Sequence, residues 1–490
     1  MKTYDIAVVG SGSGLMVVEA ALSAGLTCAV VEMGKFGGTC LTKGCIPSKM
    51  LVYPADLIRE SEDAARIGLA FAQPQVDWAR ISTRVWRQIG HHEQIEKSLD
   101  EVENLDVYKG TAEFTGPYVM RVKKADGTYA EAFRAKKFVI AAGARSFVPP
   151  IEGLEDAGYV TSETFFGEKY PKLPWKSLVI VGGGAIGAEF AHIFSAMGTK
   201  VTLVEMKPHI IPTEEEEVSD FLATNFRKNG IDVIVGAKVL KAAASPTEKS
   251  VLIEDVKTGE RRTISCEEIF ISSGVRSNGD LLNLKAAGIE VDAHGYAVAD
   301  ESLETTLKGV YAIGDINGKY QFRHKANYEA TLLIENLFGG AHKTAKYDAV
   351  PWAIFTWPQV GHVGMTEREA KEKSIRYGVA RNYYSSIAGG ISMGINERST
   401  DNGFAKIILG RDMKILGAHI VGPYASMLVQ PFVYLMNAGT PCPDTPPRRG
   451  FRHMECPKMG TVDPVTESMV IHPSMNELAA WAIEDVEWQD

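Results

Sequence analysis

Cysteine is scarce in this sequence, and long hydrophobic runs are missing altogether. Six cysteines in 490 residues are too few for a disulfide scaffold. No stretch approaches the roughly eighteen uncharged apolar residues of a transmembrane helix. The first residues, Met1 to Asp5, lack the basic and apolar regions of a signal peptide. We therefore expect a cytoplasmic protein with no membrane partner.

Long basic runs are missing as well. The chain has 52 basic and 61 acidic residues and a net charge of −9, which disfavours a nucleic-acid partner. Its 45% hydrophobic and 23% charged residues are typical of a folded globular protein. The length favours three or four domain-sized units. Glycine is in excess, with 47 copies, and much of that excess lies at the ends of apolar runs.

Two distant segments repeat one pattern. The first runs from residue 4 to Glu32, and the second runs from residue 178 to Glu205. Each contains a short apolar run, a glycine-rich turn, a helical pattern and a second apolar run that ends in an acid. This order is typical of a βαβ unit, so the sequence predicts an α/β fold with two Rossmann-like units.

The glycine turns indicate nucleotide binding. The first glycine makes a tight turn, the second lets the backbone approach a pyrophosphate, and the third permits close helix packing. The helix N-terminus faces the phosphates, and the acid binds the ribose. One such turn alone is weak support, but two with their strands and acids favour two dinucleotides. The predicted residues are Gly10, Gly12, Gly14 and Glu32 in the first unit, where Leu15 occupies the third position, and Gly182, Gly184, Gly187 and Glu205 in the second.

The acid of the second unit indicates which nicotinamide is used. A carboxylate at Glu205 accepts hydrogen bonds from a ribose 2′-OH and repels a 2′-phosphate, which favours NAD over NADP. Lys207 and His209 lie nearby, but the segment has no arginine pair.

Cys40 and Cys45 lie five residues apart. This spacing allows a small, strained disulfide ring if the start of a helix is distorted, and strained disulfides are the reducible ones. A structural bridge is not expected in a cytosolic protein. Zinc ligation is the other alternative, but a second pair at zinc spacing is missing. Beside two nucleotide units, the pair favours a redox role, and no metal site is predicted.

A histidine near the end of the chain can supply the base that a thiol cycle needs. His472 is followed five residues later by Glu477, which can hold the second ring nitrogen and fix the tautomer. Taken alone, His472 reads as an ordinary surface residue, and only the cysteine pair gives it a catalytic interpretation.

These motifs together resemble the FAD-dependent pyridine nucleotide-disulfide oxidoreductases, and most closely the dihydrolipoamide dehydrogenases. The resemblance covers nearly the whole chain. Its most specific part is Gly37-Gly38-Thr39-Cys40 with Gly44-Cys45-Ile46-Pro47-Ser48-Lys49. The end of Ala312-Ile313-Gly314-Asp315 looks like the second flavin motif of the family.

The resemblance implies roles for the thiols and the base. Cys45 would be the charge-transfer thiolate beside the flavin, and Cys40 would be the interchange thiol that meets the substrate. His472 would be the acid–base, oriented by Glu477 and supplied across a homodimer interface.

The resemblance also implies cofactor contacts. Lys49 would approach the flavin and pair with Glu189. The other positions carried over are Ala112, Gly143 and Asp315 on the FAD side, and Val239 and Gly274 on the NAD side.

Three further positions depart from the family pattern, and the last two of them touch the disulfide-substrate side. Thr42-Lys43 stands where the family usually has Asn-Val, and Val470 stands where dihydrolipoamide dehydrogenases often have a second histidine. Residues 440–467 read as an irregular insertion that contains Cys442 and Cys456, either an accessory thiol pair or two unpaired cysteines.

We predict an FAD-binding domain at 1–150, an NAD-binding domain at 151–275, a central segment at 276–347 that completes the FAD site, and an α+β dimerisation domain at 348–490. The predicted activity is oxidation of dihydrolipoamide, free or on a lipoyl-domain protein, with NAD. A reductase of a small thiol disulfide, similar to mycothione reductase, or an enzyme similar to mercuric reductase is the alternative. A non-enzymatic subunit is disfavoured by the intact set of site residues.

Overall fold

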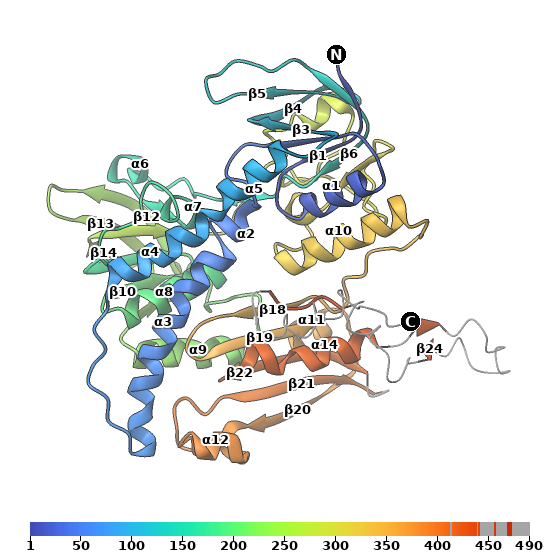
Figure 1. The fold of residues 1–490 in the computed structure, drawn as a ribbon. Helices are drawn as coiled ribbons and strands as arrows, with labels where there is room; N and C mark the ends of the chain where they lie inside the picture. Colours follow the sequence, from blue (N-terminus) through green and yellow to red (C-terminus); the bar gives the residue numbers. More distant parts are fainter. Residues whose placement is uncertain (412–413, 439, 442–454, 457–467, 473–490) are drawn as a thin grey trace. The chain divides into compact units, whose positions relative to one another are not determined.

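The computed structural model describes residues 1–490 except 412–413, 439, 442–454, 457–467 and 473–490 (Figure 1). The chain divides into two compact units. Unit 1 comprises Met1–Ala55, Pro74–Pro208 and Ile231–Lys346, and unit 2 comprises Asp56–Gln73, His209–Gly230 and Tyr347–Asp490. Within the described part, no helix is long and apolar enough to cross a membrane.

The first βαβ unit forms the centre of a seven-stranded sheet in unit 1. Its path is β3-β2-β1-β6-β5-β4, and β17 pairs with β6. The strands are β1 (Thr3–Val9), β2 (Cys28–Glu32), β3 (Leu105–Lys109), β4 (Thr111–Gly116), β5 (Val119–Lys123), β6 (Phe133–Ile140) and β17 (Val310–Ala312). Strand β1 pairs in parallel with both β2 and β6. It is apolar because helices cover parallel sheets on both faces; α1 (Gly14–Ser23) and α10 (Arg323–Phe338) lie side by side there (Figure 1).

The second βαβ unit forms a five-stranded parallel sheet with the order β11-β10-β9-β15-β8. The strands are β8 (Val160–Thr161), β9 (Ser177–Val181), β10 (Lys200–Val204), β11 (Asp232–Ile234) and β15 (Glu268–Ile271). Helix α8 (Ala185–Ala196) follows β9, as predicted. Phe190 and Phe194 on this helix pack into an aromatic core with Phe165 and Phe270.

Smaller elements complete unit 1. An antiparallel sheet of β12 (Ala237–Ala244), β13 (Lys249–Asp255) and β14 (Arg261–Cys266) lies beside the five-stranded sheet, and β7 (Ala144–Ser146) pairs with β16 (Val275–Ser277). The remaining helices are α2 (Gly38–Thr42), α4 (Trp78–Ile89), α5 (His91–Asp100), α6 (Leu154–Ala157) and α7 (Ser162–Phe165). Helix α3 (Cys45–Asp63) belongs partly to unit 1 and partly to unit 2.

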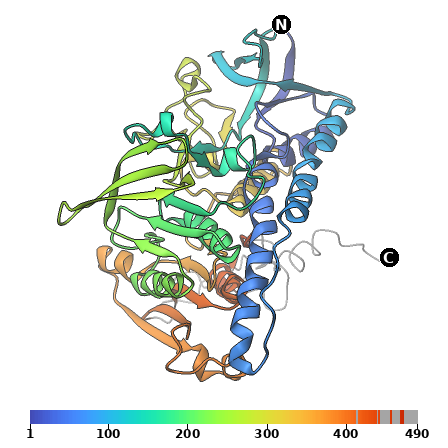
Figure 2. The same cartoon turned by 90° about the vertical axis from the view of Figure 1, so that its left-hand side faces the viewer.

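Unit 2 is built on a five-stranded antiparallel sheet with the order β18-β19-β22-β21-β20. The strands are β18 (Pro351–Ile354), β19 (Gln359–Gly364), β20 (Tyr377–Tyr383), β21 (Phe404–Gly410) and β22 (Ile415–Gly422), and the helices are α9 (Glu216–Lys228), α11 (Glu367–Glu372), α12 (Ala388–Ser392), α13 (Ala425–Leu428) and α14 (Gln430–Asn437). Although α9 is distant in sequence, it lies against this sheet beside β22 (Figures 1 and 2).

One local prediction needs correction. The segment expected to be irregular contains the short antiparallel pair β23 (Thr440–Pro441) and β24 (Glu455–Cys456). Cys442 lies outside the described residues, so the predicted accessory thiol pair stays a prediction.

Candidate functional site

The first glycine turn connects β1 to α1. Gly10 has a φ of +101°, and a Cβ atom there would lie 2.2 Å from the Ala141 carbonyl oxygen. The third glycine of the motif permits close packing of the helix on the strand, and Leu15 occupies its expected position. Gly14 takes over this role, because a Cβ atom on Gly14 would lie 2.7 Å from Val8 Cγ1. Glu32, at the end of β2, accepts hydrogen bonds from the Ser11 backbone N–H at 2.9 Å and from Ser11 Oγ at 2.7 Å.

The second turn repeats this arrangement at the atomic level. Gly182 has a φ of +107°, and a Cβ atom on Gly187 would lie 2.0 Å from the Gly182 carbonyl oxygen. Glu205 accepts hydrogen bonds from the backbone N–H groups of Gly183 at 2.7 Å and Lys207 at 2.8 Å. In both units the acid therefore holds the residue directly after the first glycine.

The two cysteines lie at neighbouring helix starts. Cys40 is buried in α2, and Cys45 is the half-buried first residue of α3. Their sulfur atoms lie within 4.8 Å of each other. Gly38 begins α2 with a φ of +73°, and a Cβ atom there would lie 2.7 Å from the Cα of Gly12. The helix that carries Cys40 is thus packed against the first glycine turn, with only glycine at the contact.

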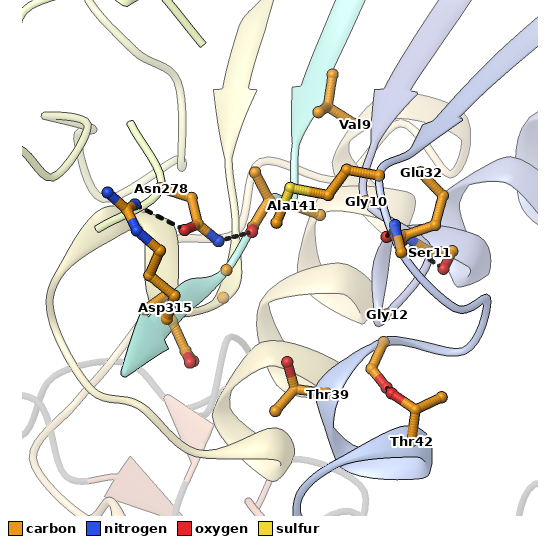
Figure 3. Close-up of a pocket in the computed structure, with 18 of the residues that line it drawn as sticks. Val9, Gly10, Ser11, Gly12, Glu32, Thr39, Thr42, Ala141, Asn278 and Asp315 are labelled. Atoms are coloured by element: carbon orange, nitrogen blue, oxygen red, sulfur yellow. Dashed lines mark hydrogen bonds between the residues drawn. The ribbon is translucent and has the colours of Figure 1, made fainter. Parts of the chain in front are cut away.

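A cavity of about 420 Å³ in unit 1 is lined by both the first glycine turn and the two cysteines (Figure 3). Its size and concave form are typical of a small-molecule site. Most of the predicted FAD-side residues line it, whereas Gly14, Lys49 and the predicted NAD-side residues do not. The predicted residues in its wall are Gly10, Gly12, Glu32, Cys40, Cys45, Ala112, Gly143 and Asp315.

Asp315 borders this cavity on the turn after β17. Desolvation raises the pKa of its carboxyl to about 6, although Lys325 opposes the shift. Lys325 lies beneath the turn, where its Nζ donates to the Gly314 carbonyl at 3.0 Å and to Asn317 Oδ1 at 2.6 Å. Glu329 pairs with Lys325 at 3.0 Å and accepts the Gly314 N–H at 2.7 Å, and both side chains are fully buried. A buried ion pair therefore shapes the turn that presents Asp315.

Lys49 and Glu189 are distant in the sequence of unit 1 and form an ion pair. Lys49 Nζ donates to Glu189 Oε2 at 2.5 Å, and their side chains are 20% and 12% exposed. Lys49 lies one turn after Cys45 on α3, and Glu189 lies on α8 after the second glycine turn. The pair expected from the resemblance is therefore present, while its role toward a flavin stays a prediction.

The remaining predicted residues are not among those that line the cavity. Val239 is buried in β12, and Gly274, with a φ of +105°, accepts a hydrogen bond from the Phe147 N–H at 2.9 Å. His472 is half-buried in unit 2, and Glu477 lies outside the described residues. The predicted acid–base pair therefore stays a prediction.

Sequence reasoning missed several residues of the cavity. Arg323, at the start of α10, places Nη1 3.5 Å from the Cβ position of Gly12 and so offers a cation at the glycine turn. Asn278 donates to the Ala142 carbonyl at 2.8 Å and accepts from Arg145 Nη1 at 2.9 Å (Figure 3). Arg323, Asn278 and Arg145 are therefore not among the residues that the sequence patterns indicated.

The residues of the cavity fit FAD. The backbone at Gly12, the N-terminus of α1 and Arg323 suit a pyrophosphate, because helix N–H groups and a guanidinium both bind anions. Glu32 lies where a ribose would be held, and Asp315 lies at the far part of the wall. The second turn, with Glu205, offers the corresponding set for a second nucleotide.

Comparison with known proteins gives consistent results. The family model described as pyridine nucleotide-disulphide oxidoreductase matches residues 4–330, and the dimerisation domain of the same family matches residues 350–445. Mycothione reductase from Mycobacterium tuberculosis is 34% identical, over 90% of this chain and 94% of its own length. Dihydrolipoyl dehydrogenase from Bacillus subtilis is 32% identical, over 87% of this chain and 90% of its own.

A third relative and a solved structure extend the comparison. Mercuric reductase from Lysinibacillus sphaericus is 31% identical, over 87% of this chain and 76% of its own length. The structure of the HOCl-induced flavoprotein disulfide reductase RclA from Escherichia coli superimposes with a TM-score of 0.75 and 26% identity, covering 97% of this chain and 98% of that one.

Proposed function

Since the chain belongs to the pyridine nucleotide-disulphide oxidoreductases, we propose that it moves electrons between NAD(H) and a dithiol–disulfide substrate through FAD and the Cys40–Cys45 pair. The family uses FAD and a nicotinamide nucleotide. The observation that carries the proposal is the position of the two sulfur atoms, within 4.8 Å of each other in the wall of the cavity that fits FAD.

In the proposed thiol–disulfide exchange, His472, Cys40 and Cys45 each have a separate role. His472 takes a proton from the substrate dithiol, and the resulting thiolate attacks Cys40 Sγ of the oxidised pair, so that Cys45 leaves as a thiolate. The second substrate thiol, once deprotonated, closes the substrate disulfide and releases Cys40. FAD held in the cavity would supply the conversion between the electron pair of the reduced Cys40–Cys45 dithiol and the hydride that NAD accepts. Lys49, held by Glu189, keeps a positive charge one turn from Cys45.

The larger organisation follows the same proposal. Residues 1–150 and 276–347 hold FAD, residues 151–275 hold NAD, and residues 348–490 form the interface of a homodimer. The match of the dimerisation family to residues 350–445 supports this assignment. His472 then acts from the partner chain.

For the substrate, we propose dihydrolipoamide. The dihydrolipoyl dehydrogenases among the relatives and the family motif around Cys40 and Cys45 support this choice. Reduction of a small thiol disulfide is the second candidate. Val470 favours it, because a second histidine of the dihydrolipoamide dehydrogenase pattern is replaced there, and mycothione reductase is among the relatives.

The deciding experiment compares substrates on the purified FAD-loaded protein. We expect kcat/KM for dihydrolipoamide with NAD to exceed the values for mycothiol disulfide, glutathione disulfide and Hg(II) with NADH by at least about 10-fold. A reversed order for a small disulfide moves the assignment to the second candidate. No turnover of any of them contradicts the proposed function.

The nicotinamide preference can be tested at Glu205. We expect the wild-type enzyme to prefer NADH to NADPH, because the carboxylate repels a 2′-phosphate. The Glu205→Gln variant keeps a hydrogen-bonding group but removes the charge, so the ratio of the two kcat/KM values should fall by about 10-fold or more, which is one charge interaction of about 1.4 kcal/mol. Glu32→Gln is the matched control in the other glycine unit and should leave the ratio unchanged. A ratio that does not move in Glu205→Gln would remove Glu205 from cofactor selection.

A further inference from the structure

A row of cross-strand neighbours crosses the sheet of unit 2. Trp352 on β18 is opposite His362 on β19, and His362 is opposite His419 on β22. The row continues with Lys406 on β21 and Arg381 on β20. Directly opposite residues in antiparallel strands point to the same face, so this one face carries two imidazoles beside two permanent cations.

The segment at the start of α9 and the first residue of α11, Glu367, supply acids to that face. Lys406 is held by Glu215 at 2.8 Å and by Glu217 and Glu367 at 2.5 Å each. Arg381 pairs with Glu217 at 2.8 Å. The adjacent Glu214 instead contacts both histidines, which makes it the shared carboxylate of two buried rings.

Each histidine ring meets an oxygen at both nitrogens. Nε2 of His362 lies 3.0 Å from the Gly364 carbonyl oxygen, and Nε2 of His419 lies 3.1 Å from that of Met365. A carbonyl oxygen only accepts, so both Nε2 atoms carry hydrogen. Both Nδ1 atoms face Glu214, with His362 at 3.0 Å and His419 in a closer contact. A lone pair on Nδ1 would repel the carboxylate, so a proton or a metal ion must lie between the two groups in each contact.

We propose that Glu214, His362 and His419 form a binding site for a divalent transition-metal ion of the zinc class, separate from the thiol site. An imidazole that donates its second N–H to a backbone carbonyl is the usual arrangement of a metal-ligating histidine. Two imidazole nitrogens and one carboxylate are a ligand set for Zn²⁺, with an open fourth position. The three ligand atoms already lie within 4.8 Å of one another.

Charge and size both suit such an ion. With two neutral imidazoles and the Glu214 carboxylate as ligands, one Zn²⁺ gives the cluster a net charge of +1, beside the acids that hold Lys406 and Arg381. Ligand atoms around a tetrahedral zinc are about 3.4 Å apart, so the 3.0 Å contact of His362 with Glu214 needs to lengthen by a few tenths of an ångström, and the closer contact of His419 by more.

Glu214 is closed off from solvent. Glu214 and His419 are fully buried and His362 is 7% exposed, so little water can screen the charge of the carboxylate. A cation in direct contact with this carboxylate is therefore favoured.

The test uses the FAD-loaded full-length protein with Cys40→Ser and Cys45→Ser, because the two thiols would compete for zinc. After EDTA treatment and dialysis, ZnCl₂ is added, the bound metal is counted and its X-ray absorption spectrum is recorded. We expect one zinc per chain with an imidazole-containing nitrogen and oxygen shell at about 2.0–2.1 Å and no sulfur at about 2.3 Å. His362→Gln and Glu214→Gln should each weaken the affinity by more than about 100-fold.

His209→Gln is the matched control. His209 also bonds a carboxylate through Nδ1, at 2.9 Å from Asp220, but it has one exposed partner and no second imidazole. It should leave zinc binding unchanged. The proposal is overturned if the protein retains no zinc, if the shell contains sulfur or lacks imidazole, or if His362→Gln binds zinc as well as the control does. Should the variants fail to fold, the absorption spectrum of the protein with all three ligands decides alone.

Discussion

The Cys45→Ser variant, loaded with FAD, is expected to lose at least about 1,000-fold in NAD-linked dithiol oxidation, because the oxygen of serine cannot form or release the disulfide on which the electron path depends. Electron transfer from NADH to ferricyanide should continue at a rate near that of the wild type, since it requires the two nucleotide sites but no thiol. A steady-state comparison of these two activities on the same preparation measures the effect.

Two other thiols in unit 1 supply the control. Burial raises the pKa of both Cys28 and Cys266 to about 11, so neither forms a thiolate near neutral pH. Cys28→Ser and Cys266→Ser should therefore keep the dithiol activity. Dithiol turnover by Cys45→Ser at a rate close to the wild type would show that the electrons take another path, and the proposed function would be wrong.

Lys325→Met is expected to cost about 3–5 kcal/mol of stability and to lower FAD retention with it. Burial lowers the pKa of Lys325, but its three contacts to Gly314, Asn317 and Glu329 keep the ammonium in place. Removing it leaves the fully buried carboxylate of Glu329 without its cation, and an uncompensated buried charge is costly. Because Glu329 also holds the Gly314 N–H, the turn that presents Asp315 should loosen at the same time.

Denaturant titration followed by flavin release and by circular dichroism measures this loss. Lys241→Met removes a comparable ion pair, 2.7 Å from Glu152, whose side chains are 51% and 72% exposed. That change should stay within about 1 kcal/mol, since exposed pairs contribute little. If the two variants are equally stable, the buried pair does not hold the turn.

Local order along the chain was enough to predict most of the nucleotide framework. A strand, a glycine turn, a helix and a terminal acid are consecutive, and backbone sterics fix what they form, so both units around Glu32 and Glu205 were predicted. The cysteine motif was equally local. The sequence did not predict that Gly14, rather than the residue at position 15, provides the close contact between helix and strand. That contact depends on how closely Val8 approaches the helix.

The parts that were missed are assembled by the fold from distant positions. Asn278 and Arg145 meet only because β7 pairs with β16, and no pattern along the chain indicates that pairing. The ligands of the proposed metal site have no short spacing along the chain that could indicate them. Glu214, His362 and His419 become neighbours through strand register and the placement of α9, which no spacing rule contains.

The contact between Gly12 and Gly38 has a consequence for how this enzyme can change. A side chain at Gly38 would collide with the first glycine turn, so helix α2, which carries Cys40, and the turn proposed to bind the pyrophosphate of FAD are in contact with no spare volume between them. Because of this contact, the cysteine segment and the first glycine turn can change in sequence only together. If the cysteine segment were replaced by that of another protein without its matching glycine turn, the two segments would clash. Sequence changes are therefore tolerated mainly on the substrate side.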